Sequence, residues 1–354
     1  MDGAGGLEVS EPMSVVEQRR GQPTLEEVAR LAGVSRATVS RVVNNSSRVS
    51  PEARAAVDRA IAQLRYIPNR AARSLVTRRT DTVALVVSEP EARVFSDPFL
   101  AAMVRGISRA IAVTDLQLVL LMAHDAREHE KVERYLTQGH ADGVMLMSLH
   151  GDDSLPRSLS SRGVPVVLSG RPRGGEPVPY VDADNRGGAA LAVDHLARSG
   201  RSRIAAITGP LDMTAAVDRY DGYADGLARA AIRLRKGLVA HGDFSERSGE
   251  WAMTALLRRN PDLDAVFVAS DPMAIGALRA LAAAGRRVPD DVAVVGFDDI
   301  PSARYAQPPL TTVRQPIEQM ARAMVALAIE QIAGDAPAEP QVLCATSLVR
   351  RESA

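Results

Sequence analysis

The segment from Gly33 to Leu75 combines many arginines with small and hydroxyl-bearing side chains, and its only acidic residues are Glu52 and Asp58. An arginine guanidinium forms paired hydrogen bonds with phosphate or guanine, and serine and asparagine also bond phosphate oxygens. Residues 22–80 contain 11 arginines and four acidic residues, whereas residues 81–354 contain 30 basic and 35 acidic residues. One end of the chain is therefore suited to contact a polyanion.

Two short helices are expected to position the first of these side chains. Thr24 and Glu27 have the capping-box pattern, which starts a helix that Gly33 ends. Ser35 has the N-cap pattern for a second helix over residues 36–43. A glycine turn between two such helices is typical of a helix-turn-helix, whose second helix fits the major groove of DNA. From this pattern we expect DNA contacts by Thr24, Ser35, Arg36, Ala37, Thr38, Ser40, Arg41 and Asn44.

A third helix follows, and it leaves a second interpretation open. Ser50 precedes Pro51, a residue favoured at the first position of a helix, and apolar residues then recur at helical spacing as far as Leu64. Three short helices also form bundles that bind no nucleic acid. In that case the arginines simply lie on a solvated face.

The stretch from Tyr66 to Leu75 is a second candidate for DNA contact. Pro68 ends the third helix, and Asn69 is suited to cap one more short helix. A helix of this length is not stable by itself. It fits a segment that folds on a partner, with a leucine wedge in the minor groove and arginines on the phosphates; the alternative is a plain linker. The residues expected to contact DNA here are Asn69, Arg70, Ala72, Arg73 and Leu75.

The whole segment from Thr24 to Leu75 resembles the DNA-binding headpiece of the lactose repressor/galactose repressor family. The resemblance rests on the turn "AGVSRATVSRVVN" and the hinge "YIPNRAARSL". It implies that Arg36 and Ala37, which follow the turn serine, read bases, with Arg41 one helical turn later. It also implies that Leu75 enters the minor groove of a symmetric operator.

From Asp81 onward, short apolar runs alternate with helical stretches, the pattern of a parallel α/β sheet. It predicts two doubly wound lobes, at about residues 82–180 and 181–310, with the C-terminal part crossing back between them. The expected strands are 83–87, 116–122, 144–147, 164–168, 204–207, 265–268 and 292–295, with a last strand pair within 343–349. The expected helices are 99–113, 187–199, 223–231, 249–258 and 273–283, with a long helix that ends at Ala333.

The strands of two such lobes end at a cleft that is suited to a small molecule. Carboxylates and an arginine fork aimed into a cleft, with an aromatic ring for stacking, suit a sugar or another polyol. The alternatives are that Asp97 and Asp271 cap helices and that Arg219, expected between a strand and a helix, forms a surface ion pair. The candidate effector-binding residues are Phe95, Asp97, Phe99, Ser148, Arg219, Ser270, Asp271 and Asp298.

The body resembles the effector-binding core of the same family, which is similar to the type I periplasmic sugar-binding proteins. The likeness rests on "FSDPFL", "VDADNRGGA", "FVASDPMAIGALRAL" and "VPDDVAVVGFDDIPSARYAQPPLTTVRQP". It implies that Arg219 and Asp298 contact the effector. Ser270 stands where many members of the family carry asparagine.

Several classes of protein are excluded or disfavoured by the residues present. Cys344 is the single cysteine, which excludes an intrachain disulfide and a cysteine metal cluster and fits a reducing cytoplasm. The six histidines lack metal-ligand spacing, and we find no nucleophile elbow or phosphate loop, so we expect no metal, cofactor or enzymatic activity. No apolar run is long enough to span a membrane, and the first 20 residues lack the pattern of a signal peptide.

The expected organisation is a disordered leader (1–21), a helix-turn-helix domain (22–67), a hinge helix or linker (68–80) and an effector-binding and dimerisation core (81–354). The expected protein is a cytoplasmic, nucleoid-associated repressor of carbohydrate-utilisation genes. It binds a palindromic operator as a homodimer and responds to a sugar or sugar phosphate. Two alternatives are a sugar-binding protein without DNA function and an enzyme of sugar or nucleotide metabolism. A steep loss of DNA affinity with salt distinguishes the regulator from both.

Overall fold

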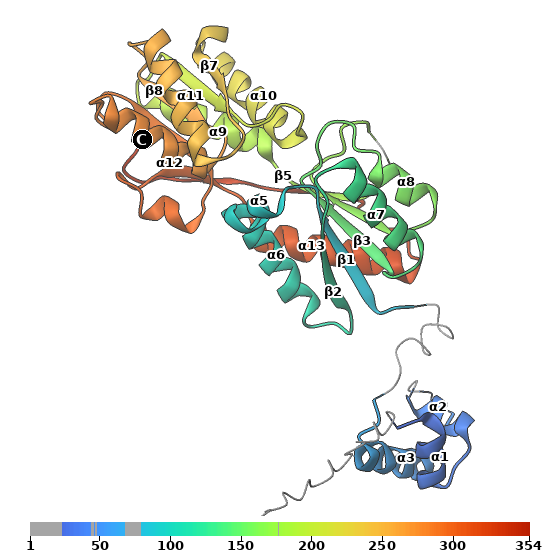
Figure 1. The fold of residues 1–354 in the computed structure, drawn as a ribbon. Helices are drawn as coiled ribbons and strands as arrows, with labels where there is room; N and C mark the ends of the chain where they lie inside the picture. Colours follow the sequence, from blue (N-terminus) through green and yellow to red (C-terminus); the bar gives the residue numbers. More distant parts are fainter. Residues whose placement is uncertain (1–22, 44–45, 47, 68–78, 176) are drawn as a thin grey trace, which may run out of the picture. The chain divides into compact units, whose positions relative to one another are not determined.

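The computed structural model describes residues 23–43, 46, 48–67, 79–175 and 177–354. The chain forms two compact units, residues 1–78 and 79–354 (Figure 1). The expected leader and nearly all of the expected hinge lie outside the described residues. Among the residues that are described, no helix combines the length and apolar character needed to cross a membrane.

The first unit contains the three helices that the caps predict. The helices are α1 (Leu25–Ala32), α2 (Arg36–Val43) and α3 (Pro51–Leu64). Thr24 and Glu27 form the capping box, and Gly33 ends α1 in the left-handed conformation with a φ of 65°, where glycine carries no steric cost. Val28, Val39 and Val57 are fully buried between the helices. Three short helices thus share one small core, which fixes the orientation of α2.

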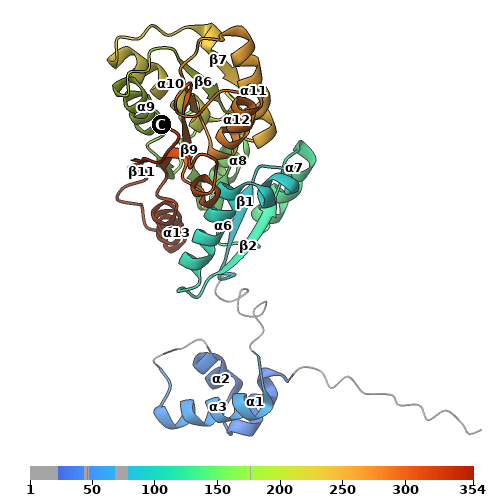
Figure 2. The ribbon, with the colours of Figure 1, turned by 90° about the vertical axis from the view of Figure 1, so that its left-hand side faces the viewer.

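The second unit consists of two lobes. Lobe one is built on a six-stranded parallel sheet (Figures 1 and 2). Its strand order is β11-β5-β4-β3-β1-β2, and helices cover both faces. The strands are β1 (Thr82–Val87), β2 (Gln117–Met122), β3 (Gly143–Met147), β4 (Val166–Ser169), β5 (Tyr180–Ala183) and β11 (Gln341–Cys344). The helices are α5 (Glu91–Ser96), α6 (Pro98–Ile111), α7 (Ala126–Thr137), α8 (Leu155–Ser161) and α13 (Ile317–Ala333).

Lobe two repeats this architecture with strand order β12-β10-β9-β8-β6-β7. Helices α9 and α10 cover one face of its sheet, and α11 and α12 cover the other. The strands are β6 (Ile204–Thr208), β7 (Val239–His241), β8 (Ala265–Val268), β9 (Ala293–Asp298), β10 (Thr311–Arg314) and β12 (Ser347–Val349). The helices are α9 (Asn185–Arg198), α10 (Thr214–Arg229), α11 (Glu246–Arg259) and α12 (Asp271–Ala283), with short 3₁₀ turns η1 (Lys236–Leu238) and η2 (Pro301–Arg304).

The chain crosses between the lobes three times, after β5, after β10 and after β11. One prediction is wrong. The strands expected as a pair within 343–349 lie on either side of the third crossing and belong to different sheets. Strand β11 pairs in parallel with β5, whereas β12 pairs antiparallel with β10. Two apolar stretches that follow each other closely look like a pair in the sequence, but only the tertiary structure decides which sheet each one joins.

Candidate functional site

Helix α2 carries most of the side chains that are predicted to contact DNA and that the structure describes. Ser35 caps it, since its Oγ accepts a hydrogen bond from the Thr38 amide at 3.1 Å. Arg36, Ala37 and Arg41 are exposed, whereas Thr38 and Ser40 are half-buried. The ion pair between Arg36 and Glu26 (3.0 Å) is well exposed, and such pairs contribute little stability. Arg36 is therefore available to exchange this partner for a nucleic acid.

Of the other residues predicted to contact DNA, one serves the fold and most lie outside the described residues. The Thr24 hydroxyl accepts a hydrogen bond from the Glu27 amide, so it serves the capping of α1. The remaining candidates, Asn44, Asn69, Arg70, Ala72, Arg73 and Leu75, lie outside the described residues.

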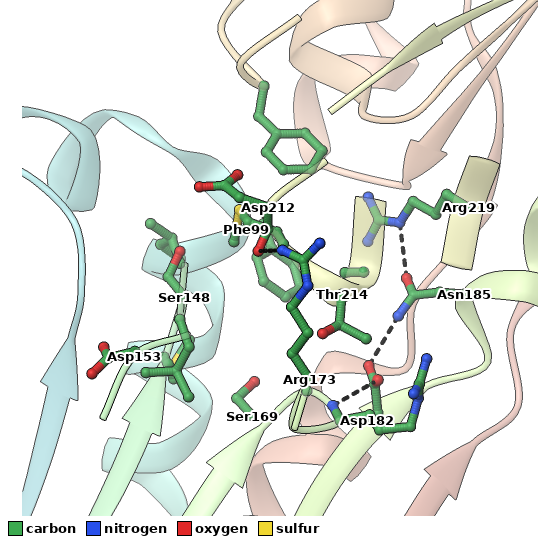
Figure 3. A pocket seen from close by; sticks show the side chains of 18 of the residues that line it. Phe99, Ser148, Asp153, Ser169, Arg173, Asp182, Asn185, Asp212, Thr214 and Arg219 are labelled. Atoms are coloured by element: carbon green, nitrogen blue, oxygen red, sulfur yellow. Dashed lines mark hydrogen bonds between the residues drawn. The ribbon is translucent and has the colours of Figure 1, made fainter. Parts of the chain in front are cut away.

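A cavity lies in the second unit where strands of both lobes end (Figure 3). It encloses about 1190 Å³ of empty space, part of it open solvent. Six of the eight predicted effector-binding residues line it: Asp97, Phe99, Ser148, Arg219, Ser270 and Asp298.

Arg219 is the buried cation of this cavity. Its Nε donates to Asn185 Oδ1 at 2.8 Å, and its Nη1 donates to the Ala269 carbonyl at 2.6 Å and to Asp298 Oδ1 at 3.4 Å. The guanidinium also lies 3.9 Å from the centroid of the Phe297 ring. No bond from Nη2 to another described residue was found, so Nη2 is the donor available to a ligand. Figure 3 shows how Asn185 connects Arg219 to Asp182.

The sequence interpretation placed Arg219 between a strand and a helix, and this is wrong. Helix α10 begins at Thr214, so Arg219 lies within its second turn. The expected start, Tyr223, is nine residues too late. The first two turns of α10 mix small apolar residues with Thr214, Asp218 and Arg219, so they lack the regular apolar spacing that marks an ordinary buried helix.

Several carboxylates lie close to Arg219. Burial raises the pKa of Asp298 to about 7, although the neighbouring Arg219 lowers it. Burial also raises the pKa of Asp182 to about 6, and it raises the pKa of Asp97. Asp298 Oδ1 accepts a second hydrogen bond, from Gln315 Nε2 at 2.7 Å. The cavity thus offers ligands several acceptors that are poorly solvated.

Three residues that line the cavity have left-handed backbone conformations. The φ angles are 59° at Ser148, 70° at Phe244 and 117° at Asp298. Non-glycine residues rarely adopt such values, and the strain is retained mainly where function requires it. These angles support the assignment of this cavity as the binding site.

Two predicted effector-binding residues do not line the cavity. The Phe95 side chain is 66% exposed and lies outside it. Asp271 is fully buried, and its oxygens accept hydrogen bonds from the Thr312 hydroxyl at 2.6 Å and the Ile300 amide at 2.9 Å. Asp271 therefore joins α12 to β10 and to the segment after β9.

Two of the predicted residues that line the cavity also cap helices. Asp97 accepts hydrogen bonds from the Phe99 and Leu100 amides, and Ser270 accepts one from the Met273 amide. The capping alternative therefore holds for Asp97 but is wrong for Asp271, because Ser270 is the residue that caps α12. Capping also aims the remaining polar surface of Asp97 and Ser270 at the cavity.

The sequence interpretation missed several polar and aromatic residues of the site. Asp182 is next to the last residue of β5, and Asn185 follows that strand. The strand-end rule that identified Asp298 therefore applies to them equally. Phe244 and Gln315 lie in short connections, and no periodicity marks such positions. The missed lining residues with polar or aromatic side chains include Arg93, Ser169, Arg171, Arg173, Asp182, Asn185, Asp212, Thr214, Phe244 and Gln315.

Residues at the rim of the cavity connect the two lobes. The Gly151 amide donates to the Asp212 carbonyl at 2.9 Å, and Arg173 Nη1 donates to the same carbonyl at 3.0 Å. Arg171 Nη2 donates to Asp218 Oδ1 at 2.7 Å. Together with His150, these residues form what we call the interlobe bridge.

His150 makes the interlobe bridge sensitive to pH. Its Nδ1 lies 2.8 Å from Asp212 Oδ2 in lobe two, and its Nε2 lies 3.2 Å from Glu89 Oε1. Arg93 contacts the other oxygen of that carboxylate, Oε2. Both nitrogens donate only when the ring is protonated. The hydrogen bonds to Glu89 and Asp212 raise the pKa of His150 above 6.5, although partial burial opposes them.

We expect the lobes to separate as pH rises through the raised pKa of His150. A raised pKa means that the contribution of His150 is fully present below pH 6.5 and lost above the raised value. Energy transfer between dyes on S160C and S302C, one on each lobe, measures the separation. The efficiency of this energy transfer should depend on pH in the S160C/S302C protein, and the dependence should be absent when H150Q is added. The control H124Q, which removes a contact within lobe one, should keep the dependence; a pH dependence that survives H150Q contradicts the assignment.

Comparison with known proteins identifies the family. Residues 24–69 match the model for bacterial regulatory proteins of the lacI family, and residues 193–354 match a periplasmic binding protein-like domain. The HTH-type transcriptional regulator CelR of Thermobifida fusca is 52% identical over 338 residues, which cover 95% of this chain and 99% of that regulator. This chain belongs to the lacI family of bacterial regulatory proteins.

Solved structures of lacI family members have the same fold. A complex of the transcriptional regulator CelR with cellobiose has a TM-score of 0.76 at 50% identity and covers 94% of this chain and 100% of that one. The lac repressor dimer bound to operator and the anti-inducer ONPF has a TM-score of 0.83 at 29% identity, with 94% and 98% covered. The predicted family and fold are confirmed, and so is the prediction of a DNA-binding transcriptional regulator rather than an enzyme.

Proposed function

We propose that this lacI family regulator represses carbohydrate-utilisation genes and that a neutral sugar in the cavity releases it from DNA. The charge of the cavity carries the proposal. Its lining includes four arginines, Arg93, Arg171, Arg173 and Arg219, and six aspartates, Asp97, Asp152, Asp153, Asp182, Asp212 and Asp298.

Each of these arginines has an acceptor within the described part of the chain. Arg93 contacts Glu89, Arg171 contacts Asp218, and Arg219 contacts Asp298. Arg173 donates to a backbone carbonyl. A phosphorylated sugar needs unpaired cations to offset its charge. The sequence left a sugar phosphate open. Three of the four arginines are paired with carboxylates and six aspartates line the same cavity, which favours an unphosphorylated sugar.

A relative that was solved with its ligand suggests a glucose disaccharide. The regulator CelR, which is 50% identical to this chain in the solved complex, binds cellobiose. Phe99 and Phe244 supply aromatic faces in the cavity for sugar rings, while Asp298 and Arg219 supply an acceptor and a donor for hydroxyls. We therefore take cellobiose as the first compound to test.

Aromatic stacking on Phe244 should contribute measurably to effector affinity. An aromatic contact contributes about 0.5–1.5 kcal/mol, so F244A should weaken cellobiose binding about tenfold at the upper end. F95A is the matched control, because that ring is exposed and outside the cavity. Isothermal titration calorimetry measures both variants. Equal losses in the two variants would place the sugar elsewhere.

DNA binding requires two copies of the headpiece. One α2 helix contacts few base pairs, so useful affinity needs two half-sites, and a symmetric dimer on a palindrome provides them. The lac repressor relative is a dimer on its operator. We propose the same for this chain, with Ser35, Arg36, Ala37 and Arg41 against the bases and backbone, and the segment containing Asn69, Arg70, Ala72, Arg73 and Leu75 in the minor groove. Such a protein acts in the cytoplasm, in association with the nucleoid.

Selection of bound sequences from a random duplex pool tests this function. We expect a palindrome, bound with a steep loss of affinity as salt rises. Cellobiose should then weaken binding to that duplex, since an effector with lower affinity for the DNA-bound state shifts the equilibrium away from it. The phosphorylated disaccharide should have no such effect. Recovery of no motif would instead favour a sugar-binding protein without DNA function.

A further inference from the structure

The outer edge of lobe two contains a second concave surface, which none of the preceding functions uses. Strand β7 is the edge strand of its sheet, and α11 packs beside it (Figure 1). A groove between them is lined by Val239, Ala240, His241, Ser248, Trp251, Ala252, Ala255 and Arg259. Trp251, the single tryptophan of the chain, is 63% exposed beside this groove.

Helix α11 presents one row of side chains along the groove. Arg247, Trp251, Ala255 and Arg259 recur at a spacing of four residues, which places them on one face of the helix. The Arg247 guanidinium lies 4.8 Å from the centroid of the Trp251 ring. The small side chain of Ala255 leaves a notch between the indole and Arg259. The row therefore combines an aromatic wall, an apolar notch and a cation at each end.

Further basic residues lie next to this row. Asn260 Nδ2 donates to the Gly237 carbonyl at 2.8 Å, which joins the end of α11 to the exposed segment 233–237. Arg203 pairs with Asp262 just after α11, but the basic residues of α11 and of segment 233–237 form no ion pair with another described residue. The acidic side chain at the start of α11, Glu246, pairs instead with Arg279 on α12 at 2.6 Å. The unpaired basic residues are Arg233, Arg235, Lys236, Arg247, Arg258 and Arg259.

We propose that this groove is a docking surface for an acidic, extended segment of a partner protein. The unpaired cations select negative charge, and the edge of β7 offers main-chain groups to an added strand. The indole and the notch over Ala255 accept an apolar side chain between the acids. The row from Arg247 to Arg259 is roughly 18 Å long at the rise of an α-helix, the length of about five or six extended residues.

Fluorescence of Trp251 reports directly on this groove in the full-length protein, because no other tryptophan contributes. The probe is a synthetic peptide of about six residues with alternating glutamate and valine, and its lysine counterpart is the charge control. We expect a saturable change in emission with the glutamate peptide only. The affinity should fall as salt rises, since exposed charges are screened.

Two charge reversals test the location. R259E should weaken peptide binding at least about tenfold, the loss expected for one charge-assisted hydrogen bond. R322E makes the same change at an exposed arginine on α13 and should leave peptide binding unchanged. The unfolding temperature of each variant shows that the fold is intact.

Several results would overturn the proposal. One is the absence of a saturable response, and another is an equal response to the lysine peptide. A third is equal weakening by R259E and R322E. Displacement of the peptide by a duplex that lacks the operator would make nucleic acid the occupant, and an emission change on raising the protein concentration alone would make it a second copy of the chain.

Discussion

Replacing Arg219 with alanine is expected to lower the affinity for the effector at least about hundredfold, since a charge-assisted hydrogen bond contributes about 1.5–3 kcal/mol and more than one contact is lost. The variant loses the Nη2 donor that faces the cavity. It also removes the cation that lowers the pKa of Asp298, so this buried carboxyl is protonated more readily and is a weaker acceptor. Isothermal titration calorimetry with cellobiose gives the affinity.

The same substitution should also destabilise lobe two, because breaking a buried ion pair costs about 3–5 kcal/mol. A second variant separates the two effects. R219M combined with D298N removes both charges, so we expect the unfolding temperature to recover while cellobiose binding stays lost. Binding of cellobiose by R219A with unchanged affinity would show that Arg219 does not hold the effector.

The headpiece substitution R36A is expected to lower operator affinity about thirtyfold or more. An arginine that bonds guanine with both donors contributes about 1–3 kcal/mol to discrimination, and a dimer makes that contact twice, for a total of about 2–6 kcal/mol. The exposed pair with Glu26 adds little to the fold. The stability of the headpiece should therefore change by much less than its affinity for DNA.

R59A is the matched control, since Arg59 is exposed on α3 and was not predicted to contact DNA. Repeating the sequence selection with R36A shows which kind of contact is lost. Relaxed preference at one base position in each half-site indicates base reading, whereas a uniform loss with a shallower salt dependence indicates a phosphate contact. Equal affinities of R36A and the parent protein would remove Arg36 from the interface.

Much of the fold is predictable because apolar runs and caps report local structure directly. Strand β8 spans the residues expected for it, and α13 ends at Ala333 as predicted. The failures have physical causes. The first turns of α10 were missed because small and polar residues alternate there without a regular apolar spacing. The separation of β11 from β12 depends on contacts that no local pattern records.

The candidate site was predictable where a strand end marks a residue. Asp298 ends β9 and lines the cavity, as expected. Asp271 also follows a strand, but its carboxylate turns inward to the Thr312 hydroxyl, and only packing decides between the two orientations. Phe244 and Arg173 approach the cavity from connections whose paths depend on the rest of the fold, so the sequence alone did not select them.

The central claim is that a neutral sugar in the cavity controls DNA binding by the same chain. The most direct test measures the affinity of the full-length protein for its selected palindrome with increasing cellobiose, in the parent protein and in the double variant R219M/D298N. We predict that cellobiose weakens DNA binding by the parent protein and has no effect on the variant, which still binds DNA. An operator affinity in the parent protein that does not change with cellobiose or related neutral disaccharides would contradict the claim.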